Sequence, residues 1–114
     1  MATDRTFVTE LATGLGMLGG DDLGATIAAR PATFANLGDA EWDRIERLWH
    51  AGEHREDFER GIGNGRAFLT AADALNGRRP RIVEWTGPRR APGDEVVPAD
   101  LRVDHVYLVS CKYL

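Results

Sequence analysis

The last fourteen residues of the chain read LRVDHVYLVSCKYL and alternate in the way that β-strands do. Successive strand residues point to opposite faces of a sheet, and here both faces are apolar from Val106 to Val109. This pattern predicts one strand over Leu101–Tyr113, covered on both sides. Because so apolar a strand ends the chain, we expect the chain to be part of a longer protein or to complete its sheet in a homo-oligomer.

A carboxylate, Asp104, and an ammonium, Lys112, stand on this predicted strand. A charge is costly to bury, so we expect each of them to be paired, exposed at a strand end, or functional. On one straight strand they would lie about 26 Å apart, at about 3.3 Å per residue. No glycine or proline stands between them to indicate a reversal of the chain.

The first two thirds of the chain repeat apolar residues at helical spacing. Helices are expected from Thr3 or Asp4 to Leu18, from Asp21 or Asp22 to Ala28, from Asp39 as N-cap to Gly52, and from Asn64 to Leu75. The glycine-rich segment Gly61–Arg66 predicts either a turn between helices or a cradle of backbone amides for a phosphate. Asn76-Gly77 is typical of a helix end, since both residues tolerate the left-handed conformation.

After this stop the period of the apolar residues changes from helical to alternating, which predicts a strand over Arg81–Thr86. Helices followed by strands indicate an α+β fold, in which several short helices pack on a small C-terminal sheet with strands near 81–86 and 101–113. We expect one domain over residues 1–114, with a helical part at 1–77 and a strand part at 78–114.

Composition limits the classes of function. The net charge of −4 argues against a protein dominated by nonspecific binding of nucleic acid. The single cysteine, Cys111, rules out an internal disulfide and is typical of a reducing cytosol. Neither a secretory signal nor a membrane-spanning run is visible, so we expect a cytoplasmic protein with no membrane partner. The near absence of lysine is typical of a GC-rich bacterial coding sequence.

The C-terminal region carries the clearest functional pattern, which is Asp104 followed by Ser110-Cys111-Lys112. It resembles the PD-(D/E)XK nuclease superfamily over residues 81–114, with a serine in place of the second acidic residue. The resemblance implies an incomplete restriction-endonuclease-like core, a Mg²⁺ ion held by Asp104 and Glu84, and catalysis by Asp104, Glu84 and Lys112. Asp100 is an alternative acidic ligand. The other interpretation makes Asp104 and Lys112 ordinary charges at strand ends.

Five arginines stand within thirteen residues in or beside the strand Arg81–Thr86. If this strand pairs with the last one, Arg79, Arg89 and Arg90 gather near one edge and contact DNA phosphates. The alternative is a solvated rim. The segment His50–His54 also spells HxxEH, a zinc-protease pattern, and its alternative is a polar helix end.

Two functions follow from these patterns. The first is a metal-dependent DNA endonuclease, or a truncated relative of one, that hydrolyses phosphodiesters with Mg²⁺. The second is a non-catalytic interaction protein that pairs through an exposed sheet edge with itself or with a partner. The nuclease requires Asp104 or Asp100, together with Glu84 and Lys112, to converge on one cavity. The interaction protein requires an unpaired apolar strand edge and no such convergence.

Overall fold

The computed structural model describes residues 4–19, 22–72, 74–85, 101–104 and 107–109, the last three by their backbone. Its elements follow in the order α1 (Asp4–Met17), α2 (Leu23–Ala29), β1 (Phe34–Ala35), α3 (Asp39–Ala51), α4 (Arg55–Thr70), β2 (Val83–Trp85), β3 (Leu101–Val103) and β4 (Tyr107–Val109). The fold is α+β, as expected from the sequence, with the helices ahead of most of the sheet.

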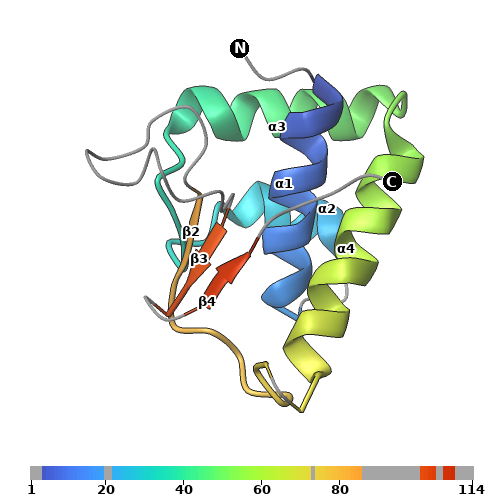
Figure 1. Ribbon diagram of the computed structural model, residues 1–114. Coiled ribbons are helices and arrows are strands. Elements are labelled where there is room, and N and C mark those ends of the chain that lie inside the picture. Colours follow the sequence, from blue (N-terminus) through green and yellow to red (C-terminus); the bar gives the residue numbers. More distant parts are fainter. Residues whose placement is uncertain (1–3, 20–21, 73, 86–100, 105–106, 110–114) are drawn as a thin grey trace.

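Helix α1 occupies the centre of the molecule, with the sheet on one side and α4 on the other (Figure 1). Every residue from Phe7 to Met17 is buried, because neighbours surround the helix. Its two buried threonines satisfy their hydroxyls within the helix. Thr9 Oγ1 donates to the Arg5 carbonyl at 2.8 Å, and Thr13 Oγ1 donates to the Thr9 carbonyl at 2.7 Å. A helix buried on all sides must be apolar or internally bonded in this way.

Helix α4 runs without interruption through the glycine segment that the sequence assigned to a turn or a phosphate cradle. That prediction is wrong, and close helix packing is the reason. Gly61 and Gly65 face α1, and a Cβ on Gly61 would lie 2.6 Å from the Ala12 Cβ and 3.1 Å from the Thr13 nitrogen. The glycines therefore serve contact between two backbones, and this contact outweighs their low helix propensity.

Helices α2 and α3 pack beside each other and are joined by an ionic clamp. Asp22 caps α2 by accepting a bond from the Ala25 nitrogen at 3.2 Å. The left-handed residue Arg30 ends α2, and its guanidinium bonds to Asp39 at 3.3 Å and to Asp43. Asp39 is the first residue of α3 rather than its N-cap, which is Gly38. Of the apolar residues predicted to form one stripe of this helix, Trp42, Ile45 and Leu48 are buried, and Trp49 is half-buried.

Helices α1 and α3 are also joined by an ion pair, in which Arg44 Nη2 lies 2.7 Å from Asp4 Oδ1. This hydrogen bond holds the pKa of Asp4 below its usual value. A carboxyl whose pKa is lowered by folding stabilises the protein above its unfolded pKa, near pH 4, and loses that contribution as the pH falls through the folded value.

We therefore expect Arg44→Gln to raise the pKa of Asp4 toward its usual value. An NMR titration of the side-chain carboxyl carbons measures this change. Arg47→Gln is the control, because Arg47 acts on Asp4 only through space and as a smaller cause. Equal shifts of the Asp4 pKa in the two variants would contradict the assignment.

The described residues form a sheet of four strands in the order β1-β2-β3-β4. β1 is parallel to β2, while β2, β3 and β4 are antiparallel neighbours. β1 was not expected, since Phe34–Ala35 is too short to show an alternating pattern. The expected strand over Leu101–Tyr113 is also wrong, because the chain reverses after Val103 and returns as β4, with Val103 opposite Tyr107.

The end of the helical part differs from expectation as well. Helix α4 ends at Thr70, five residues before Leu75. Hydrogen-bonded turns follow the helix. In them the Leu75 nitrogen donates to the Phe68 carbonyl at 3.3 Å, and the Gly77 nitrogen donates to the Leu69 carbonyl at 2.6 Å. Leu75 is still buried, at 1% exposed, so the apolar spacing identified a core residue but not its conformation.

The core forms where α1 meets the sheet. β2 and β3 turn alternate residues toward this core, which contains Val83, Trp85, Leu101 and Val103. Trp85 packs edge-on against Phe7 of α1, with ring centroids 5.5 Å apart and planes at 84°. Glu84 lies between Val83 and Trp85 and therefore belongs to the opposite face of the sheet.

Candidate functional site

Asp104 occupies the turn between β3 and β4 in the left-handed conformation, with φ of 52°. Its Oδ1 accepts bonds from the backbone nitrogens of Arg81, at 2.6 Å, and Ile82, at 3.1 Å. The Asp104 nitrogen in turn donates to the Ile82 carbonyl at 2.9 Å. Asp104 thus fastens the hairpin turn to the segment that leads into β2, and one of its carboxylate oxygens is committed to that task.

Glu84 of β2 pairs across the strands with Arg102 of β3. The guanidinium reaches both carboxylate oxygens, with Nε 3.2 Å from Oε1 and Nη2 3.1 Å from Oε2. The register that sets Glu84 opposite Arg102 makes this contact. The Glu84 side chain is 11% exposed, so a paired guanidinium is what allows the carboxylate to be buried there.

These two carboxylates do not fit a divalent cation by themselves. Mg²⁺ requires several hard oxygen ligands, whereas Asp104 serves backbone amides and Glu84 serves Arg102. Within the described ranges, no group of three or more His, Cys, Asp or Glu residues could hold a metal ion. A Mg²⁺ ion held by Asp104 and Glu84 therefore remains a prediction, and it would need further oxygen ligands.

The remaining predicted residues are placed as follows. Lys112, Arg89 and Arg90 lie outside the described residues, as does the alternative ligand Asp100. Arg79 is described and exposed, ahead of β2. The contact of these arginines with DNA remains a prediction.

The HxxEH segment spans a break between two helices. His50 is in the last turn of α3, Gly52 ends that helix at φ of 75°, and His54 is the N-cap of α4. The two histidines therefore do not share one helix face, which a zinc-binding pair at this spacing requires. His54 Nδ1 instead lies 3.6 Å from Asp57 Oδ2. The alternative interpretation, a polar helix end, describes this segment.

Two polar residues at the sheet were not singled out from the sequence. One is Arg102, the partner of Glu84. The other is Glu10 of α1, which is 8% exposed and accepts a bond of 2.9 Å from Trp85 Nε1. Glu10 stands within the apolar stripe of α1, so its burial could have been inferred from helical spacing. Its partner could not, since 75 residues separate the two.

The β3–β4 hairpin changes how the C-terminal motif is arranged. Leu101, the first residue of β3, pairs with Val109, the last residue of β4. In the sequence Asp100 directly precedes Leu101, and Ser110-Cys111-Lys112 directly follow Val109. The segment from Leu101 to Val109 is therefore not one straight strand, which was the assumption behind the expected separation of about 26 Å.

The chain matches no protein-family model, no curated protein and no solved structure. None of the helices described in the structure is both long enough and apolar enough to cross a membrane.

Proposed function

We propose that this chain carries a nuclease centre of the PD-(D/E)XK type that hydrolyses DNA phosphodiesters, with Asp100 rather than Asp104 as its acidic residue. The observation that supports the proposal is the pairing of Leu101 with Val109. One partner follows Asp100 in the sequence, and the other precedes Ser110-Cys111-Lys112. Asp100 and Ser110-Cys111-Lys112 are therefore the sequence neighbours of two residues that lie opposite each other in the hairpin.

The chemistry of the two residues suits this class of reaction. A carboxylate such as that of Asp100 is a hard oxygen ligand of the kind Mg²⁺ prefers. The Lys112 ammonium is a cation able to stabilise the negative charge that develops on the phosphoryl group. Glu84 neighbours β3 across the β2–β3 register, and it supports the centre through Arg102.

The sharpest test compares three variants in cleavage of supercoiled plasmid DNA with Mg²⁺ or Mn²⁺. We expect Asp100→Asn and Lys112→Ala to lower the cleavage rate by about 100-fold or more, as is usual when an electrostatic catalytic group is removed. Asp104→Asn is the matched control and keeps the rate, since its amide oxygen still accepts the bonds from Arg81 and Ile82. Chelation by EDTA abolishes cleavage in every case.

If Asp104→Asn lost activity while its fold stayed intact, Asp104 rather than Asp100 would be the acidic residue of the centre. That result would contradict the proposal. Equal cleavage by Lys112→Ala and the parent chain would overturn the nuclease function itself. Thermal unfolding of each variant shows whether a loss arises from misfolding.

A second candidate function rests on the position of β4 at the end of the sheet order. An edge strand can pair with a strand of another chain. In this alternative the protein is a non-catalytic interaction protein, and sedimentation would show a concentration-dependent dimer. The plasmid assay would then show no metal-dependent cleavage by the parent chain.

A further inference from the structure

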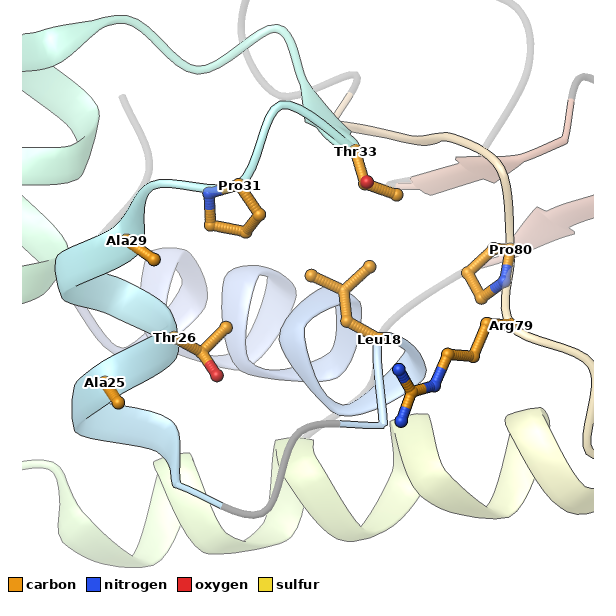
Figure 2. A pocket seen from close by; sticks show the side chains of 8 residues that line it. All are labelled: Leu18, Ala25, Thr26, Ala29, Pro31, Thr33, Arg79 and Pro80. Atoms are coloured by element: carbon orange, nitrogen blue, oxygen red, sulfur yellow. The ribbon is translucent and has the colours of Figure 1, made fainter.

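A hollow of about 430 Å³ lies beside α2, and neither Glu84 nor Arg102 is among the residues that line it. We call it the α2 hollow, and its lining comes from the end of α1, from α2, from the connection to β1 and from the approach to β2: Leu18, Ala25, Thr26, Ala29, Pro31, Thr33, Arg79 and Pro80. Figure 2 shows the Leu18 side chain facing the middle of the hollow and Arg79 extending along its rim. The volume falls within the usual range of sites for small molecules, about 300–1,000 Å³.

The lining has one charge. Arg79 contributes a guanidinium, and none of the described residues that line the hollow carries a carboxylate. Arg79 forms no ion pair or side-chain hydrogen bond with any residue that the structure describes, unlike Arg30, Arg44 and Arg102. A guanidinium with free donors beside an apolar surface is suited to bind a carboxylate through two parallel hydrogen bonds.

A second polar group in the lining is the hydroxyl of Thr33. The Thr33 hydroxyl has no hydrogen-bond partner among the described residues, while the Thr33 carbonyl accepts the Val83 nitrogen at 2.8 Å and fixes this residue to the sheet. The Thr26 hydroxyl, by contrast, donates to the Asp22 carbonyl at 2.9 Å. The hollow therefore offers apolar walls, one cation and one free hydroxyl.

We propose that the α2 hollow binds a small organic acid whose single carboxylate pairs with Arg79 and whose aliphatic or aromatic body packs on Leu18, Pro31 and Pro80. One guanidinium balances one negative charge, whereas a phosphate monoester carries between about 1.5 and 2 charges at neutral pH. The walls favour an apolar body, because its burial removes apolar surface from water. The test of this proposal does not depend on DNA cleavage, and Glu84 and Arg102 are not among the residues that line the hollow, so either proposal can fail without the other.

The test is an NMR titration of the ¹⁵N-labelled chain with hexanoate, phenylacetate and phenyl phosphate, and with the neutral amides hexanamide and phenylacetamide. We expect saturable shifts of the Ala25, Ala29 and Thr33 amide signals with the two carboxylates, and weaker binding of the matched amides. Arg79→Gln lowers the affinity for the carboxylates by about tenfold or more, as expected for the loss of a charged hydrogen bond. It leaves the affinity for the amides unchanged.

Arg78→Gln is the matched control, because Arg78 is exposed and does not line the hollow. Ala29→Leu narrows the hollow and is expected to weaken the binding of acids and amides alike. The proposal is overturned if Arg78→Gln and Arg79→Gln weaken binding equally, or if no carboxylate shifts these signals. It is also overturned if phenyl phosphate or a short DNA duplex binds in an Arg79-dependent manner and the carboxylates do not.

Discussion

Replacing Gly65 with alanine is expected to destabilise the protein by about 3 kcal/mol or more, at the upper end of what overpacking costs. Gly65 lies in α4 where that helix touches the backbone of α1. A Cβ there would overlap the Thr13 carbonyl oxygen, and would lie 2.8 Å from the Met17 nitrogen and 2.9 Å from the Gly16 Cα. The obstructing atoms belong to a helix backbone, so they cannot move aside as a flexible side chain would, and the two helices must separate.

Gly63→Ala is the matched control in the same helix. Gly63 is exposed, and an added Cβ would meet nothing within 4 Å. Since alanine has the higher helix propensity, this variant is expected to stabilise the protein by up to about 1 kcal/mol. Urea unfolding followed by circular dichroism measures both changes in the free energy of unfolding. Similar effects of the two substitutions would contradict the close packing of α1 on α4.

Replacing Asp104 with alanine is expected to destabilise the protein by about 2–3 kcal/mol, for two separate reasons. Alanine removes the acceptor for the Arg81 and Ile82 nitrogens, at about 1 kcal/mol for each bond. It also places a residue with a Cβ and no polar side chain in the left-handed conformation, at about 1 kcal/mol. Hydrogen exchange at the Arg81 and Ile82 amides is expected to accelerate.

Two further substitutions at this position separate the two reasons. Asp104→Asn retains both the acceptor and the tolerance for a positive φ, so its free energy of unfolding stays close to that of the parent chain. Asp104→Gly removes the strain of the left-handed conformation but does not restore the two hydrogen bonds. Its free energy of unfolding is therefore expected to fall between those of Asp104→Asn and Asp104→Ala. If alanine were as stable as asparagine, Asp104 would not hold the hairpin, and its carboxylate would be available for another role.

Asp104 also shows why the candidate site was only partly accessible from the sequence. The residue stands in an alternating apolar run, and no glycine or proline marks a reversal there. The reversal is stabilised by amides of residues more than twenty positions earlier, Arg81 and Ile82. Local turn chemistry therefore could not reveal it. Strand alternation is enough to put Glu84 on the face opposite Trp85, but its partner Arg102 depends on strand register.

The glycines of α4 were misinterpreted for a similar reason. Glycine lowers helix propensity, so three glycines at alternate positions predict a break when the segment is considered alone. Gly61 and Gly65 are four residues apart and lie on one face of the helix, where the α1 backbone approaches. That approach is visible only once α1 is placed beside α4.

The sequence by itself determined the α+β class, the extents of α1 and α3, and the buried stripe of Trp42, Ile45 and Leu48. Those features depend on the spacing of apolar residues within one segment, and this spacing acts over a few residues. Only the tertiary structure decided the continuity of α4, the β3–β4 hairpin and the partners of Glu84 and Asp104. Each of these depends on backbone or charged groups brought together from distant parts of the chain, and their interaction energies exceed the local preferences that they override.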